Sequence, residues 1–306
     1  MPYFEVNDGS GFQMHYEVVP DCLPVDTLFI HGNIASNLWW YPLRDELRLR
    51  ASNHKNSSHA NNSHTSNKWT GKMIMAEFRG CGRSVLYKGL SYKEFLQKLP
   101  AEEFEKTWDP GFDFDRMVQD FQDLILELKK QKIILDSLAI VGHSTGGLIA
   151  GLLLAQAPDL FSKALLLDPV GMRGMRFSDD ILKSFKRVRF DEKFRDQIFA
   201  AVIPKSYLQQ PEFFHDFVEQ SMRSVDQIGK TIVHWMENVD YTERFRRIHT
   251  PVLVVHGERD IILPMSDSQE MAATIPNAQF YCAPNVGHSM NAEAPAAFAD
   301  LLLQFL

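Results

Sequence analysis

The sequence predicts an α/β protein with a mostly parallel sheet of seven or eight strands flanked by helices. Two observations carry this prediction. Short apolar runs of strand length recur along the chain, and longer stretches with helical periodicity separate them. This alternation is typical of parallel strands joined by crossover helices. With 306 residues, of which 45% are hydrophobic and 23% charged, the chain is also long and apolar enough to bury a large core.

Each expected strand has its own signal in the sequence. Apolar and polar residues alternate over residues 12–18, which predicts an early, half-exposed strand. Continuous apolar runs predict buried strands over residues 27–31, 73–78, 138–141, 164–167 and 252–255, with a last strand near residues 279–282.

Three helices are expected between and after these strands. Met117, Phe121, Leu124 and Leu128 recur at one-turn spacing and form one apolar stripe, as in a helix that packs on a sheet. Residues 148–156 follow a glycine-rich turn and are apolar nearly all round, so a buried central helix is expected there. Residues 294–306 are expected to form the final helix.

Two segments interrupt the alternation. Residues 51–70 are crowded with Asn, Ser and His, which predicts a mobile polar insertion at the surface. Residues 171–250 have helical periodicity and are expected to form a helical cap over the carboxyl edge of the sheet, where ligands bind in such folds. The chain then divides into a first core part (1–170), the cap (171–250) and a second core part (251–306).

Charge and hydropathy exclude several classes of partner. The 32 basic and 39 acidic residues give a net charge of −7, and nucleic acid and anionic membranes attract basic surfaces instead. No run of about 18 apolar residues occurs, so no membrane span is expected. Neither nucleic acid nor a membrane is therefore an expected partner, and no oligomeric state is predicted.

The cysteines and histidines do not suggest a metal or a disulfide framework. Cys22, Cys81 and Cys282 are widely spaced and odd in number, which favours a reducing, cytoplasmic location. The polar insertion contains three histidines, but a flexible tract lacks the neighbouring groups that orient metal ligands; they are His54, His59 and His64. No P-loop or complete dinucleotide-binding motif occurs. Neither a metal nor a cofactor is expected.

The residues Gly142-His143-Ser144-Thr145-Gly146 carry the strongest chemical signal. They follow an apolar strand and precede a helix, which is the context of a nucleophile elbow. A serine on so tight a turn has a strained backbone, and glycines two residues to either side relieve the crowding. Its hydroxyl needs an imidazole base oriented by a carboxylate. Asp260 and His288 follow later strands and supply both groups.

With this order of serine, acid and histidine, the chain resembles the α/β-hydrolase superfamily. The resemblance covers nearly the whole chain and extends to three further segments. The segments are His31-Gly32-Asn33 after the third strand, the H-G-x-x-D-x-x-x-P pattern at 256–264 and the G-H-x-x-x-x-E-x-P pattern at 287–295. A turn at 79–84 also resembles a family motif, with Glu77 where Asp is usual. The resemblance implies an eight-stranded sheet with a cap inserted after strand six.

The resemblance also implies a role for each site residue. Ser144 attacks the acyl carbon, His288 transfers the proton, and Asp260 orients the imidazole. The main-chain N–H groups of Asn33 and Thr145 form the oxyanion hole. Asp168 is the rival acid, because its strand end opens onto the site in some relatives. The neighbouring histidines at positions 143 and 256 are not expected to act as the base, His143 because it points away and His256 because core packing explains it.

The serine nucleophile favours acyl chemistry. The expected reaction is hydrolysis of a carboxylic ester, lactone or thioester of a small molecule through an acyl-enzyme. Carbon–carbon bond hydrolases and acyltransferases use the same triad and stay open as alternatives. So does a non-catalytic, hydrolase-like protein that binds a ligand in the same pocket. Aromatic residues of the cap, such as Phe213, Phe217 and Trp235, offer apolar surface for an acyl group.

Overall fold

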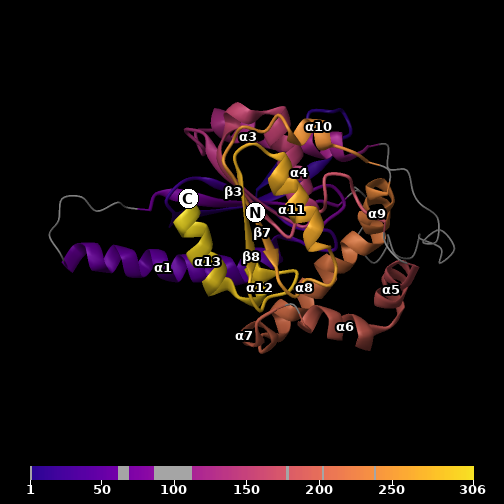
Figure 1. Cartoon of the computed structure of the whole chain (residues 1–306). Helices are drawn as coiled ribbons and strands as arrows, with labels where there is room; N and C mark the ends of the chain where they lie inside the picture. The colour runs from indigo at the N-terminus through magenta and orange to yellow at the C-terminus, as the bar shows by residue number, and fades with distance from the viewer. Residues whose placement is uncertain (1, 61–68, 86–111, 177–178, 202, 238) are drawn as a thin grey trace.

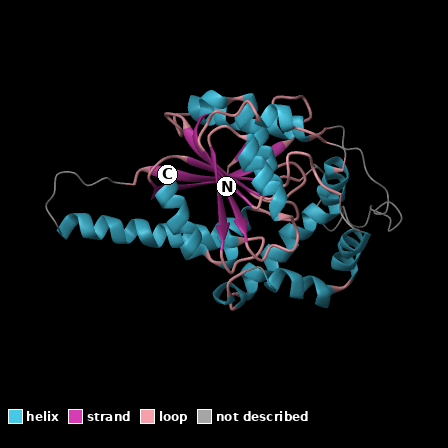
Figure 2. Ribbon diagram, viewed as in Figure 1, coloured by secondary structure: helices cyan, strands magenta, loops and turns pink. Residues whose placement is uncertain are grey.

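The computed structural model describes residues 2–60, 69–85, 112–176, 179–201, 203–237 and 239–306. Eight strands form one sheet at the centre of these residues, in the order β1-β2-β4-β3-β5-β6-β7-β8 (Figure 2). The pairs β1–β2 and β2–β4 are antiparallel, and the remaining pairs are parallel. The predicted mostly parallel, eight-stranded sheet is confirmed.

Seven of the strands lie where the sequence predicts them, β2 from its alternating pattern and the others from apolar runs. The strands are β1 (Tyr3–Glu5), β2 (Gln13–Leu23), β3 (Thr27–Ile30), β4 (Gly71–Ala76), β5 (Leu138–His143), β6 (Phe161–Leu167), β7 (Val252–Gly257) and β8 (Ala278–Ala283). No strand was predicted at β1, because its three residues are largely exposed at the sheet edge and show no apolar run. The strand β2 continues past its predicted end because it pairs with β4 as far as Leu23.

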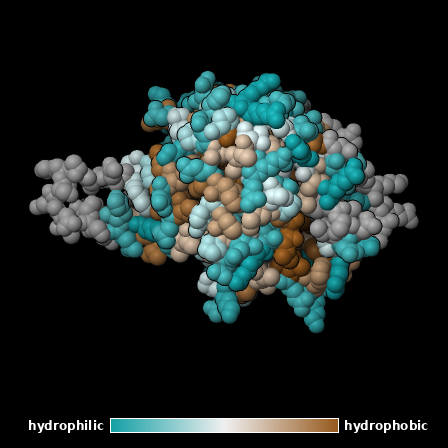
Figure 3. Space-filling model, viewed as in Figure 1, coloured by the Kyte–Doolittle hydropathy of each residue, from teal (hydrophilic) through white to brown (hydrophobic). Residues whose placement is uncertain are grey.

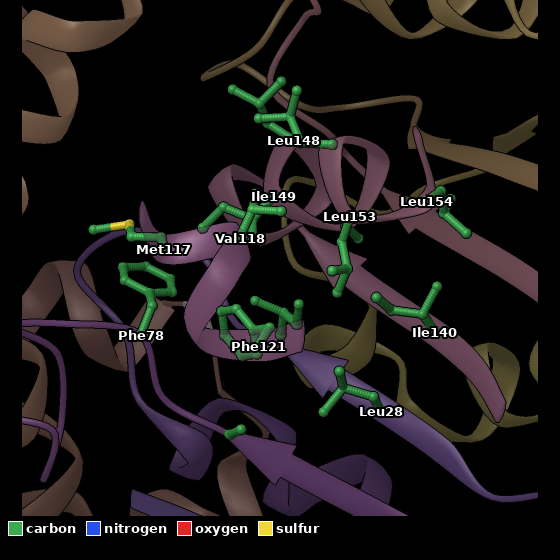
Figure 4. Close-up of a cluster of buried hydrophobic side chains, with 14 of the residues drawn as sticks. Leu28, Phe78, Met117, Val118, Phe121, Ile140, Leu148, Ile149, Leu153 and Leu154 are labelled. Atoms are coloured by element: carbon green, nitrogen blue, oxygen red, sulfur yellow. The ribbon is translucent and has the colours of Figure 1, made fainter. Parts of the chain in front are cut away.

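Helices cover both faces of the sheet (Figure 2). On one face, α1 (Tyr41–Ala60) and α13 (Pro295–Phe305) share a buried cluster with Phe29, Val141 and Leu165. On the other face, α3 (Phe114–Lys130) and α4 (Thr145–Gln156) pack on Leu28 and Ile140 (Figure 4). Neighbouring strand residues thus point to opposite faces, and both layers exclude water.

Shorter helices complete the core. They are η1 (Asn37–Trp40), η3 (Pro158–Leu160), α11 (Met265–Thr274) and α12 (Met290–Glu293). The helices predicted at 117–128, 148–156 and 294–306 correspond to α3, α4 and α13. From Leu148 to Leu154 every residue of α4 is buried, as its all-round apolar sequence indicates. Glu77 is also buried and accepts hydrogen bonds from the main-chain N–H groups of Asn37 (2.9 Å) and Arg83 (2.7 Å), so its role is to hold loops.

The predicted loop at residues 51–70 is partly wrong. Residues 51–60 are the second half of α1, which extends away from the body of the protein (Figure 1). Adding one residue to an existing helix is much easier than starting one, and residues 51–70 contain neither Gly nor Pro to stop it. His54 stacks on Trp69 with ring centroids 5.3 Å apart. Residues 61–68 lie outside the described residues, and so does the side chain of His59.

A helical segment lies between β6 and β7, where the sequence predicts the cap. Its helices are α5 (Asp179–Phe190), α6 (Glu192–Ala201), α7 (Lys205–Leu208), α8 (Pro211–Ser224), the π-helix η4 (Val225–Gly229), α9 (Lys230–Met236) and α10 (Thr242–Phe245). One buried cluster joins α5, α6, α8 and α9 to Leu38 and Trp39, which follow β3. Phe245 of α10 instead packs in the core, where a side chain at Gly151 of α4 would collide with its ring.

Hydrophilic residues cover much of the face seen in Figure 3, and hydrophobic ones gather near its middle. Among the large hydrophobic side chains exposed to solvent are Ile261 and Ile262, in the loop that follows β7. Within the part of the chain that the structure describes, every helix is too short or too polar to cross a membrane.

Candidate active site

Ser144 lies in a strained turn between β5 and α4. Its backbone has φ 55° and ψ −120°, a conformation that residues other than glycine rarely adopt. A Cβ added to Gly142 would lie 2.3 Å from the main-chain oxygen of Gly146, and one added to Gly146 would lie 2.3 Å from that of Ile30. The expected reason for both glycines is confirmed: the chain approaches too closely for a side chain.

Replacing Gly146 with alanine is expected to lower the free energy of unfolding by about 3 kcal/mol, because the new Cβ meets main-chain oxygens that cannot rotate away. Urea denaturation measures the change. Gly9→Ala is the control, because a Cβ at Gly9 meets no other atom. Only the positive φ of 77° opposes this substitution, and we expect it to lower the free energy of unfolding by about 1 kcal/mol. Equal losses in the two variants would contradict the crowding argument.

The second part of the site is a hydrogen-bonded pair of an acid and a histidine. Asp260 follows β7 and His288 follows β8, and His288 Nδ1 lies 2.7 Å from Asp260 Oδ2. The other oxygen, Asp260 Oδ1, accepts the main-chain N–H groups of Ile262 (2.7 Å) and Leu263 (3.1 Å). Burial by itself raises the pKa of Asp260, but its hydrogen bond with His288, the charge of that imidazole and these N–H groups hold it below its ordinary value. Asp260 is therefore an ionised partner for His288.

His143 connects the elbow to His288. Its Nε2 lies 2.7 Å from the main-chain oxygen of His288, and the two imidazole rings are 4.9 Å apart. Burial lowers the pKa of His143 to about 3, so the ring is neutral at pH 7. Because a carbonyl only accepts, Nε2 carries the proton and donates it. His143 is thus not remote from the site: it holds the main chain of His288, a role that its position beside Ser144 could have suggested.

Glu293 holds the same loop from the other side. Its two carboxylate oxygens accept the main-chain N–H groups of Gly287 and Ser289, each at 2.9 Å. These are the two residues that flank His288. The loop therefore has fixed hydrogen bonds on both sides of the imidazole, and the E in the predicted G-H-x-x-x-x-E-x-P segment has a structural explanation.

Asp168 lies close to the site but hydrogen-bonds elsewhere. It follows β6 with φ 42°, is fully buried, and accepts the main-chain N–H of Gly257 at 2.7 Å through Oδ1. Burial first, and then the negative charges of Asp260 and Glu293, raise its pKa well above the ordinary value. It lies within 4.8 Å of ring nitrogens of His143 and His288. Of the two candidate acids, the one that hydrogen-bonds His288 is Asp260.

Two of the side-chain groups that could hold a metal ion overlap this site. They are His143, Asp168 and His288, and Asp168, His256 and Asp260. Among the described residues, His256 Nδ1 has a hydrogen-bond partner in Ser268 Oγ (2.9 Å), whereas the buried atoms His143 Nδ1 and Asp168 Oδ2 have none. A third group lies on α8, where His215 and Asp216 are exposed and Glu219 is half-buried.

The loop after β3 lies directly on the elbow. A Cβ added to Gly32 would be 3.0 Å from Ser144 Cβ and 3.1 Å from His143 Nδ1, so this position favours glycine. Asn33 follows Gly32, and Thr145 follows Ser144 as the first residue of α4. The first N–H groups of a helix have no partner within the helix. They point out of its N-terminus and stabilise a negative charge placed there. Of the two predicted oxyanion residues, Thr145 therefore adjoins Ser144 itself and Asn33 adjoins Gly32, which lies against Ser144.

Comparison with known proteins identifies the family. Residues 27–301 match the alpha/beta hydrolase family. The chain belongs to this family, as its motifs predict.

Among related proteins, a non-heme chloroperoxidase of Kitasatospora aureofaciens is 28% identical over 222 residues, which cover 65% of this chain and 76% of that protein. An sn-1-specific diacylglycerol lipase of Mus musculus is 25% identical over 209 residues, covering 64% and 66% of the two chains. An esterase from Exiguobacterium antarcticum has a similar fold, with a TM-score of 0.68, 18% identity and coverage of 99% and 98%. Family and relatives support hydrolysis as the general activity.

Proposed function

We propose that the protein is a serine hydrolase that cleaves a carboxylic ester, lactone or thioester through an acyl-enzyme on Ser144. One observation carries the proposal: the side chain of Asp260 is hydrogen-bonded to His288, and this pair lies beside the elbow. The link to the elbow is His143, the neighbour of Ser144, whose imidazole binds the main chain of His288. In this proposal the nucleophile, base and acid follow the ends of three parallel strands, β5, β8 and β7. The lipase and the esterase among the relatives support an ester substrate.

The hydrogen bond to Asp260 decides which nitrogen of His288 is the base. The carboxylate accepts a hydrogen bond from Nδ1–H, so the proton stays on Nδ1 and the lone pair is on Nε2. Nε2 takes the proton of Ser144 Oγ as this oxygen attacks the acyl carbon. It then gives that proton to the leaving oxygen or sulfur. Water, activated by the same nitrogen, releases the acid and restores the serine.

The negative charge that forms on the acyl oxygen needs donors that are already in place. The main-chain N–H groups of Thr145 and Asn33 supply them in this proposal, from the first turn of α4 and from the loop that packs on Ser144. Removing one such donor costs about 3 kcal/mol of transition-state stabilisation in other enzymes.

A substrate panel tests the proposed bond class. We expect p-nitrophenyl esters, a lactone or a thioester to be hydrolysed with kcat/KM of about 10⁴ M⁻¹s⁻¹ or more for the preferred class. A vinylogous 1,5-diketone and an acyl acceptor alcohol, included in the same panel, report carbon–carbon cleavage and acyl transfer. Turnover of the diketone alone, or of no compound, would contradict the ester proposal.

A further inference from the structure

Three hydrogen bonds join the loop after β3 to one strip of the helical segment. We call residues 31–39 the β3 loop and residues 221–229, at the end of α8 and through η4, the cap strip. The bonds run from Asn33 Nδ2 to the main-chain oxygen of Gly229 (2.9 Å), from Ser224 Oγ to that of Ala35 (3.2 Å) and from Trp39 Nε1 to Ser221 Oγ (3.3 Å). Each bond pairs one residue of the loop with one residue of the strip.

Apolar contacts hold the same two segments together. Trp39 of the β3 loop packs on Phe217 of α8 with ring centroids 5.1 Å apart, and both rings are buried. Ala35 and Leu38 belong to the same cluster, which also contains Val225 of the cap strip. The β3 loop and the cap strip are therefore packed and hydrogen-bonded as one unit.

Asn33 lies where two unusual backbone segments meet. Ile34 has φ 54°, which is rare for a β-branched residue and persists only where neighbouring contacts hold it. Gly229 is the last residue of the π-helix, whose widened turn is a type of distortion often found at functional sites. The Asn33 carboxamide binds both: Oδ1 accepts the N–H of Ile34 (3.0 Å) and Nδ2 donates to Gly229.

We propose that the Asn33 side chain is a positioning residue, which uses the cap strip to hold the main-chain N–H of Asn33 toward the oxyanion. This inference rests on the proposed function. An oxyanion donor works only when its direction is fixed before the reaction. The sequence places Asn33 in the site through its backbone, whereas the structure gives its side chain a separate task. The shape of the oxyanion hole then depends on the cap strip.

The variant Asn33→Asp tests the tether while keeping the main-chain donor. The carboxylate still accepts the Ile34 N–H, but it cannot donate to Gly229. We expect kcat for the preferred ester to fall at least tenfold while KM changes less than about threefold, because a misplaced donor stabilises the transition state less well. The Ki of a boronic acid, which binds as a tetrahedral anion, rises by the same factor as kcat/KM falls. The Ki of a neutral amide analogue stays the same.

Ser224→Ala removes a neighbouring bond and should show a smaller change of the same kind. Tyr207→Phe is the matched control, because its hydroxyl also joins the helical segment to the core but binds α1, at Tyr41 (3.1 Å) and Asp45 (2.5 Å), instead of the β3 loop. We expect its kcat and both Ki values to match those of the wild type. Asn33→Asp with kcat within twofold of wild type, or with equal losses for boronic acid and amide, overturns the proposal.

Hydrogen–deuterium exchange provides a readout that needs no turnover. Asn33→Asp should speed exchange of the β3 loop amides at least tenfold, and Tyr207→Phe should leave them unchanged. If the wild type hydrolyses no substrate, the proposed function fails on its own, and the exchange rates still decide whether the tether exists. Unchanged loop exchange in Asn33→Asp would overturn the tether whatever the activity.

Discussion

Replacing Ser144 with alanine is expected to lower kcat for the preferred ester by about 10⁶-fold, the loss seen when a catalytic serine that works with its base is removed. Without Oγ there is no acyl-enzyme, and the imidazole of His288 has no nucleophile to activate. The variant should fold, because the substitution removes one atom and keeps the glycines that relieve the turn. Steady-state kinetics measure the loss of kcat, and thermal unfolding tests whether the variant is folded.

Ser84→Ala is the matched control for this experiment. Ser84 is a fully buried serine whose hydroxyl donates to the main-chain oxygen of Glu77 and accepts the N–H of His15, both at 2.8 Å. Its loss removes two hydrogen bonds in which neither Ser144 nor the Asp260–His288 pair takes part, so stability falls by about 1 kcal/mol while kcat stays within a few fold. If Ser144→Ala kept wild-type turnover, the nucleophile would have to be another residue.

Asp260→Asn is expected to lower kcat by about 10⁴-fold. Asp260 Oδ1 accepts two main-chain N–H groups, so the amide oxygen of the variant must occupy that position. The amide nitrogen then faces His288 Nδ1 and donates to it. His288 must carry its proton on Nε2, where it cannot accept the proton of Ser144. The pH dependence of kcat/KM and the rate itself measure the effect.

The same substitution at Asp168 separates the two candidate acids. Asp168 has a raised pKa and accepts its hydrogen bond from Gly257, so an uncharged amide resembles its protonated form. We expect Asp168→Asn to keep kcat within about tenfold of wild type, because His288 retains its partner. The opposite result, with Asp168→Asn the more damaging change, would make Asp168 the acid of the triad.

The sequence predicted those parts of the fold that follow from local patterns. Apolar runs and one-turn stripes record burial directly, so seven strands and the helices α3, α4 and α13 were found. The edge strand β1 has no such pattern, because solvent covers most of it. The second half of α1 has a loop-like composition, and it is helical because the chain continues a helix whose first half packs on the sheet.

The site also combines features that local motifs predict with contacts between residues far apart in the chain. The elbow and the hydrogen-bonded pair of Asp260 and His288 were predictable because their chemistry requires particular residue types at strand ends. The bond from His143 to His288 spans 145 residues, and that from Asn33 to Gly229 spans 196. Neither leaves a pattern in the sequence, because a carbonyl partner can belong to any residue. Such contacts come only from the three-dimensional structure.

The most direct test of the account is covalent labelling with a fluorophosphonate, followed by peptide mass spectrometry. A serine made nucleophilic by a neighbouring imidazole reacts with this probe, whereas an ordinary hydroxyl does not. The account predicts one adduct per chain, on Ser144, and its loss in His288→Ala, in which the serine is present but has no base. Labelling that fails in the wild type, or that persists in His288→Ala, would contradict it.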